Sequence, residues 1–112
     1  MTRPAVPETD VAGAVAQAAD GAILLDVREP HEWQAGHAPD AVHVPLGLLS
    51  PDSVPGAGPV VVVCRSGNRS AYATAALLSV GRAAVNLVGG MQAWSHRGQP
   101  VVRDDGSPGE VL

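Results

Sequence analysis

The only cysteine of the chain, Cys64, comes directly after four consecutive valines, Val60 to Val63. The residues that follow it, Arg65 to Ser70, include two arginines, a glycine and an asparagine. A cysteine thiolate is a nucleophile, and guanidinium groups suit oxyanions. The pattern therefore indicates a nucleophile followed by an anion-binding loop. A lone cysteine after a buried strand is also typical of a small core residue, which is the alternative interpretation.

The loop after Cys64 has the spacing Cys-x4-Arg and continues through Ser66 to Ser70. Gly67 can adopt positive φ where the loop must curl, and Asn68 tolerates left-handed geometry. We expect backbone N–H groups to provide most of the anion binding, with Arg65 at the mouth. For Arg69 two roles stay open, contact with substrate or an ion pair with a carboxylate.

Several kinds of chemistry find no support in the sequence. No second cysteine and no histidine lies in the loop, which argues against a Cys–His pair and a dithiol. The four histidines are scattered, so we expect no metal and no other cofactor. The net charge of −4 argues against a nucleic-acid partner. No apolar segment approaches the roughly 20 residues that span a bilayer, so we expect no membrane contact and a cytoplasmic protein.

Strand and helix signals alternate along the chain. Apolar strand-length runs occupy 22–27, 41–45, 60–63 and 83–88, and helical patterns occupy 10–20, 29–36, 69–81 and 89–98. In the helix 69–81, Ala71, Ala75 and Leu78 form the expected buried stripe. The alternation predicts a three-layer α/β domain over 10–102 with a mostly parallel sheet. We expect residues 1–9 to be a flexible arm and 103–112 a solvated tail.

In such a sheet, ligands bind beyond the carboxyl ends of the strands, where Cys64 falls. The N-terminus of the following helix favours negative charge there. Asp26 and Arg28 end a neighbouring strand, and Glu32 lies on the next short helix. Buried charges are normally paired, so we expect these three residues to brace the loop rather than to act on substrate.

The segment "CRSGNRS" resembles the active-site loop of the rhodanese-like family. "LLDVREPHEWQAGHAPDAVHVPL" and "LVGGMQAWSHRGQPV" are similar to two further signatures of that family, in the same order. The resemblance implies a central sheet of five parallel strands. It also implies a sulfurtransferase in which Cys64 takes a sulfane sulfur from thiosulfate or a related donor.

The acceptor of that sulfur would be cyanide, a small thiol, or a protein such as one resembling thioredoxin. Two other functions stay open. The first is a phosphatase or arsenate reductase, whose loops also place a cysteine before a helix; phosphatases of the thiolate class use the longer spacing Cys-x5-Arg. The second is a non-catalytic interaction module that keeps only the fold.

Overall fold

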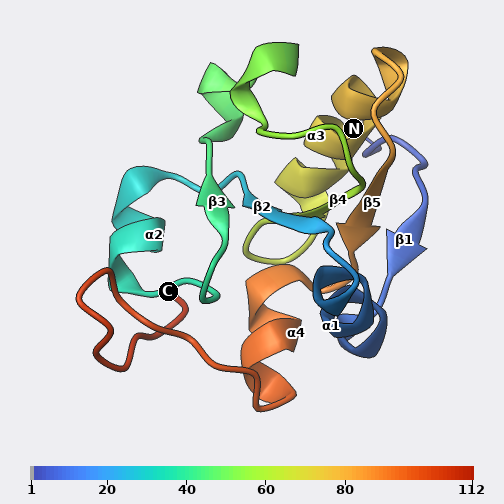
Figure 1. Cartoon of the computed structure of the whole chain (residues 1–112). Coiled ribbons are helices and arrows are strands. Elements are labelled where there is room, and N and C mark those ends of the chain that lie inside the picture. Colours follow the sequence, from blue (N-terminus) through green and yellow to red (C-terminus); the bar gives the residue numbers. More distant parts are fainter. Residues whose placement is uncertain (1) are drawn as a thin grey trace.

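The computed structural model describes residues 2–112 and contains one sheet of five parallel strands (Figure 1). The strands are β1 (Glu8–Thr9), β2 (Ile23–Asp26), β3 (Val42–His43), β4 (Val60–Val63) and β5 (Ala84–Leu87), in the spatial order β1-β5-β4-β2-β3. The helices are α1 (Val11–Ala19), α2 (Pro30–Ala35), α3 (Asn68–Ser79) and α4 (Gly90–His96), with 3₁₀ turns η1 (Leu46–Leu48) and η2 (Pro51–Ser53). The predicted α/β fold with a parallel five-stranded sheet is confirmed. None of the helices in residues 2–112 is long and apolar enough to cross a membrane.

Strand β4 lies at the centre of the sheet and is buried on both faces. Val61 and Val63 pack in the same cluster as side chains from α1 and α4, whereas Val60, Val62 and Cys64 pack with side chains from α3. Figure 1 shows α1 and α4 on one side of the sheet and α3 on the other. Because successive side chains of a strand point to opposite faces, this position requires an unbroken apolar run.

Local signals set the ends of the two short N-terminal helices. The Asp10 carboxylate accepts a hydrogen bond from the Gly13 N–H at 2.8 Å and caps α1. Pro30 occupies the first position of α2, where its missing N–H costs no hydrogen bond. Asp10 and Pro30 therefore mark where these two helices begin.

The buried face of α3 differs from the expected stripe. Leu78 is 38% exposed, while Ser70, Thr74 and Leu77 are buried. The two hydroxyl residues point inward because each has a partner there: Ser70 Oγ donates to Asn86 Oδ1, and Thr74 Oγ1 donates to the Ser70 carbonyl. An apolar pattern alone could not indicate this, since it treats serine and threonine as outward-facing.

The two ends of the chain are tied to the domain by backbone hydrogen bonds. Glu8 and Thr9, expected within a flexible arm, instead form the edge strand beside β5. In the C-terminal segment, the Glu110 N–H donates to the Ala35 carbonyl at 2.9 Å, and Val102 pairs with His37. Most side chains of 103–112 stay exposed, yet the backbone of this segment follows a defined path along α2.

The turn between β5 and α4 lies directly against the backbone of the cysteine loop. Met91 N–H donates to the Cys64 carbonyl at 2.8 Å, and Gln92 N–H donates to the Arg65 carbonyl at 3.0 Å. A Cβ atom on Gly90 would lie 2.3 Å from the Cys64 oxygen, and the φ of Gly90 is +56°. Only glycine permits this approach.

A second tie joins α2 to the start of α3. Arg69 donates from Nη1 to Glu32 Oε1 at 2.7 Å and from Nη2 to Glu32 Oε2 at 2.8 Å. The hydrogen bond from Arg69 outweighs the opposing effect of burial and lowers the pKa of Glu32 from 4.5 to about 2. The bidentate geometry gives this ion pair a fixed orientation as well as charge attraction.

Gly90→Ala is expected to destabilise the protein by about 3 kcal/mol or more, because the new methyl group meets backbone atoms and the φ is unfavourable. Gly81→Ala is the matched control, since Gly81 also has positive φ (+82°) but has no atom within 4 Å of an added Cβ. That variant should lose only about 1 kcal/mol. Urea unfolding of both variants measures the difference, and equal losses would show that the close approach carries no cost.

Glu32→Gln is expected to lower the free energy of unfolding at pH 7 by about 1–2 kcal/mol, a value reduced for the partial exposure of Arg69. Because the folded-state pKa of Glu32 is depressed, the contribution of the pair is fully present above 4.5 and is lost as the pH falls toward about 2. The difference between wild type and variant should therefore shrink over that range. Urea unfolding at a series of pH values tests this, with the exposed Asp52→Asn as a control whose difference from wild type should stay small. A pH-independent difference for Glu32→Gln would contradict the assignment.

Candidate active site

Cys64 is the first residue after β4, and its side chain lies inside the curl of the loop that follows. The residue is only 1% exposed. Its Sγ atom accepts hydrogen bonds from the Gly67 N–H at 3.1 Å and from Ser70 Oγ at 3.2 Å. The curl depends on Gly67, whose φ is +105°. A sulfur that accepts two hydrogen bonds, next to the start of a helix, lies where negative charge is favoured.

The sequence analysis missed a buried polar network that lies next to the sulfur and connects Ser70, Asn86 and Gly67. Asn86 on β5 accepts from Ser70 Oγ through Oδ1 and donates through Nδ2 to the Gly67 carbonyl at 3.0 Å. Ser70 and Asn86 are both fully buried. The signal in the sequence was a single amide within the apolar strand run "AAVNLV", which a purely packing role does not need.

The three arginines near the loop have different partners. Arg69 pairs with Glu32, and the hydrogen bonding of its guanidinium to that carboxylate raises the pKa of Arg69, against the effect of burial. Of the two roles left open for Arg69, the structure thus shows the ion pair. Arg65 is exposed, and its Nε donates to the Leu112 carbonyl at 2.6 Å. Arg3, which the sequence analysis did not single out, donates from Nη1 to the Gly67 carbonyl at 2.8 Å.

The expected braces Asp26 and Arg28 form a fully buried ion pair with each other. Arg28 Nη2 donates to Asp26 Oδ2 at 2.8 Å and to the Gly36 carbonyl at 2.8 Å. His43 Nε2 donates to the Arg28 carbonyl at 2.7 Å. These hydrogen bonds hold the end of α2 and the strand β3, whereas none of them reaches residues 64–70. Glu32 is the one expected brace that bonds to the loop directly, through Arg69.

The structure therefore separates the predicted site residues into four groups. Asp26 and Arg28 form the buried pair described above. Cys64, Gly67 and Ser70 meet around the sulfur atom. Arg69 and Glu32 form a bridge at the edge of the loop. The exposed side chains of the loop are those of Arg65, Ser66 and Asn68.

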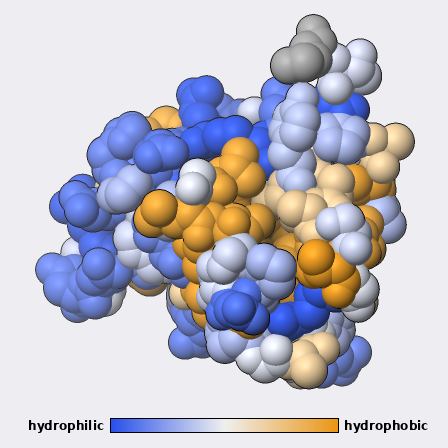
Figure 2. Space-filling view, turned by 90° about the horizontal axis from the view of Figure 1, so that it is seen from above, coloured by the Kyte–Doolittle hydropathy of each residue, from blue (hydrophilic) through white to orange (hydrophobic). Residues whose placement is uncertain are grey.

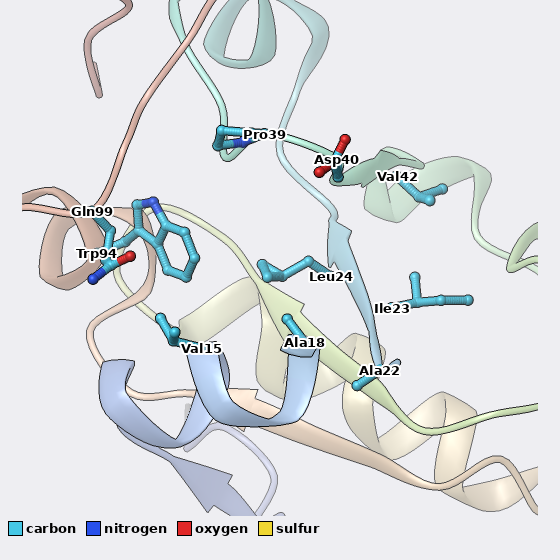
Figure 3. Close-up of a pocket in the computed structure, with 10 residues that line it drawn as sticks. All are labelled: Val15, Ala18, Ala22, Ile23, Leu24, Pro39, Asp40, Val42, Trp94 and Gln99. Atoms are coloured by element: carbon cyan, nitrogen blue, oxygen red, sulfur yellow. The ribbon is translucent and has the colours of Figure 1, made fainter. Parts of the chain in front are cut away.

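The cavity shown in Figure 3 lies away from the cysteine loop. It has a volume of about 290 Å³ between α1, the start of β2 and the end of α4, and its lining includes Ala18, Leu24, Asp40 and Trp94. Figure 2 shows hydrophobic side chains gathered on one outer face of the molecule. The most exposed large apolar side chain of residues 2–112 is that of Leu48, at 73%.

No residue from 64–70 lines the cavity of Figure 3. This cavity is therefore separate from Cys64, which is 1% exposed and held within residues 64–70.

Proteins with similar sequences include several with sulfurtransferase names. A protein named sulfurtransferase from Allochromatium vinosum is 40% identical over 87 residues, which are 75% of this chain and 81% of that protein. The thiosulfate sulfurtransferase GlpE of Pseudomonas syringae is 40% identical over 78 residues, which are 66% of this chain and 73% of that protein. The uncharacterized protein slr1261 of Synechocystis is 38% identical over 96 residues, which are 83% of this chain, and this chain spans only 54% of its length.

Solved structures of related proteins share the fold. The rhodanese-related protein of Thermoplasma volcanium superposes with a TM-score of 0.78 at 30% identity, covering 87% of this chain and 98% of that one. The family model described as rhodanese-like domain matches residues 11–97, from the start of α1 to just beyond α4. Together with the loop that cradles Cys64, these matches show that the chain belongs to the rhodanese-like domain family.

Proposed function

We propose that the chain is a sulfurtransferase in which Cys64 carries a sulfane sulfur as a persulfide. The observation that carries the proposal is the pair of hydrogen bonds, from the Gly67 N–H and Ser70 Oγ, that converge on Sγ. Donors fixed by the fold stabilise a thiolate without having to reorganise during the reaction. An inert core cysteine has no need of such donors. The sulfurtransferase names of the relatives support the same reaction class.

The first step is attack of the Cys64 thiolate on the outer sulfur of thiosulfate. A thiolate lone pair forms the new S–S bond, and the electron pair of the old S–S bond leaves with sulfite. The products are the persulfide anion and sulfite, and the total charge is unchanged. In the second step an acceptor thiolate or cyanide attacks the outer sulfur, and the Cys64 thiolate is the leaving group. Two displacements through one covalent intermediate give ping-pong kinetics.

The burial of Cys64 favours a donor whose transferable sulfur is narrow and terminal. At 1% exposure the residue can be reached only by a small group entering between the loop residues. Thiosulfate fits this requirement, and a relative is named for it. Arg65, exposed on the same loop, would attract the anion.

The chain contains no second thiol to resolve the intermediate, so release requires an outside acceptor. Cyanide, a small thiol or a cysteine on a thioredoxin-like partner would serve. A reducing compartment such as the cytoplasm would supply such thiols and keep Cys64 reduced.

Wild-type protein incubated with thiosulfate should gain the mass of one sulfur atom, whereas Cys64→Ser should gain none. The reason is that a serine hydroxyl of similar size cannot act as the sulfur nucleophile at neutral pH. Intact-mass spectrometry after desalting measures the loading, and circular dichroism checks that the variant is folded. Ser95→Ala, on the exposed side of α4, is the matched control and should load fully. Equal loading of the Cys64→Ser variant would refute the mechanism.

The loaded protein should keep its extra sulfur until cyanide or glutathione is added and should then return to its original mass. Loss at the same rate without any acceptor would count against a sulfur carrier.

Thiosulfate should be used in strong preference to aryl phosphates. The spacing from Cys64 to Arg69 is one residue shorter than the Cys-x5-Arg loops of thiolate phosphatases, so the ring of N–H groups is too small for a phosphoryl group. In addition, Arg69 is bonded through both terminal nitrogens to Glu32. Assays with p-nitrophenyl phosphate should show no hydrolysis above that of Cys64→Ser. Hydrolysis that depends on Cys64 would favour the alternative function of a phosphatase instead.

A further inference from the structure

The Ser70 hydroxyl has one proton and two acceptors within reach. Its Oγ lies 3.2 Å from Cys64 Sγ and also within hydrogen-bond distance of Asn86 Oδ1. A hydroxyl donates only one hydrogen bond, so it can serve one of these acceptors at a time. Since all three side chains are buried, the acceptor that is not served receives no bond from water.

The orientation of the Asn86 amide is set by the loop itself. Nδ2 donates to the Gly67 carbonyl at 3.0 Å. If the amide were flipped, Oδ1 would face the Gly67 carbonyl oxygen, and two acceptors would lie against each other. Nδ2 would then point toward Ser70. The network therefore holds the amide oxygen toward the Ser70 hydroxyl.

The protonation state of Cys64 decides which acceptor is served. When Cys64 is a thiol, the S–H can donate to Ser70 Oγ while the Ser70 proton goes to Asn86, and every group is satisfied. When Cys64 is a thiolate, the charged sulfur draws the Ser70 proton, because hydrogen bonds to charged groups are the stronger ones. Asn86 Oδ1 then loses its donor in a dry environment, which is a cost borne only by the thiolate form.

We propose that Asn86 is a positioning residue that controls the direction of the Ser70 hydroxyl and thereby the balance between the thiol and thiolate forms of Cys64. It acts through Ser70, not on the substrate. The consequence for sulfur transfer rests on the proposed function. In the persulfide the charge moves to the outer sulfur, so the Ser70 proton can return to Asn86, and the network favours the loaded state over the free thiolate.

The other charged groups around Cys64 have partners outside this network. Arg69 of α3 pairs with Glu32 of α2, Arg3 of the N-terminal segment bonds to the Gly67 carbonyl, and Arg65 bonds to the Leu112 carbonyl. At the end of the neighbouring strand β2, Asp26 and Arg28 pair with each other. Substitution of Asn86 or Ser70 removes no hydrogen bond made by these pairs. The charged groups around Cys64 therefore keep their partners in these variants. Asn86→Leu does remove the hydrogen bond from Nδ2 to the Gly67 carbonyl, but the bond from Arg3 still holds that carbonyl.

The test is the pH dependence of iodoacetamide alkylation of Cys64, the only thiol in the chain. Asn86→Leu removes the competing acceptor, so the midpoint of the alkylation profile should move about half to one pH unit lower. Ser70→Ala removes the donor to the thiolate, so the midpoint should move about one unit higher. Asn86 acts only through the Ser70 hydroxyl, which the double variant lacks. The midpoint of the double variant should therefore equal that of Ser70→Ala.

Thr74→Val is the matched control, because Thr74 is also a buried hydroxyl of α3 but bonds only to the Ser70 carbonyl. Its midpoint should equal that of wild type. If the leucine variant does not fold, Asn86→Val, which suits a strand, replaces it with the same expected direction. The proposal would be overturned if the alkylation midpoint of the Asn86 variant were unchanged or higher than that of wild type. It would also be overturned if the shifts of the two single variants simply added in the double variant.

A second measurement uses the wild-type protein. Asn68 and Asn86 are the only asparagines, so selective ¹³C labelling gives two side-chain carbonyl signals, which Asn86→Leu assigns. The Asn86 carbonyl signal should titrate with the same midpoint as alkylation, and Ser70→Ala should abolish that titration. A signal that does not respond in wild type would overturn the proposal. Neither readout requires sulfur transfer, so a chain that fails to load sulfur but shows these shifts would refute the proposed function alone.

Discussion

The arrangement of the site depends on the pairing of the carbonyl groups in the cysteine loop with donors from outside the loop. Cys64 and Arg65 present their carbonyls to the N–H groups at the start of α4, and Gly67 presents its carbonyl to Asn86 and Arg3. A buried carbonyl must have a partner, so these contacts fix the outward direction of each one. With these three carbonyl groups held in this way, the loop can curl so that the Gly67 N–H points at the sulfur of Cys64. The cradle is thus a consequence of how the loop is held from outside.

The same principle explains why the charged residues near the site are mostly structural. Arg69 would be unfavourable at a helix N-terminus if it were left alone, and Glu32 offsets its charge with two hydrogen bonds. Asp26 and Arg28 are fully buried and satisfy each other at the end of β2. Once these pairs are formed, Arg65 is the exposed cation of the loop. The electrostatics that favour an anion at Cys64 therefore come mainly from hydrogen-bond donors and from the start of α3.

Sequence reasoning located the central strand and placed Cys64 at its end because these features depend on local patterns. The four valines before Cys64 indicate a strand buried on both faces, and the bounds of β4 match them. It erred on the inward face of α3, where Ser70 and Thr74 replace the expected Leu78, because an apolar pattern treats both hydroxyl residues as outward-facing. The side-chain partner of Ser70, Asn86, lies 16 residues away on another element. Asn86 and Arg3 were missed because they lie 19 and 64 residues from Gly67, and only the folded chain brings them together.

In the proposed sulfur transfer, a site built this way would divide control between two sets of residues. The groups that bond to the sulfur are a backbone N–H and a buried hydroxyl, and both are held by the fold. The exposed side chains of Arg65, Ser66 and Asn68 do not hold the sulfur in place. These three positions can therefore change without dismantling the cradle, so in the proposed sulfur transfer they are the places where the choice of donor or acceptor would be altered. Replacing either member of the Ser70–Asn86 pair, in contrast, removes a buried hydrogen bond from the network next to the sulfur.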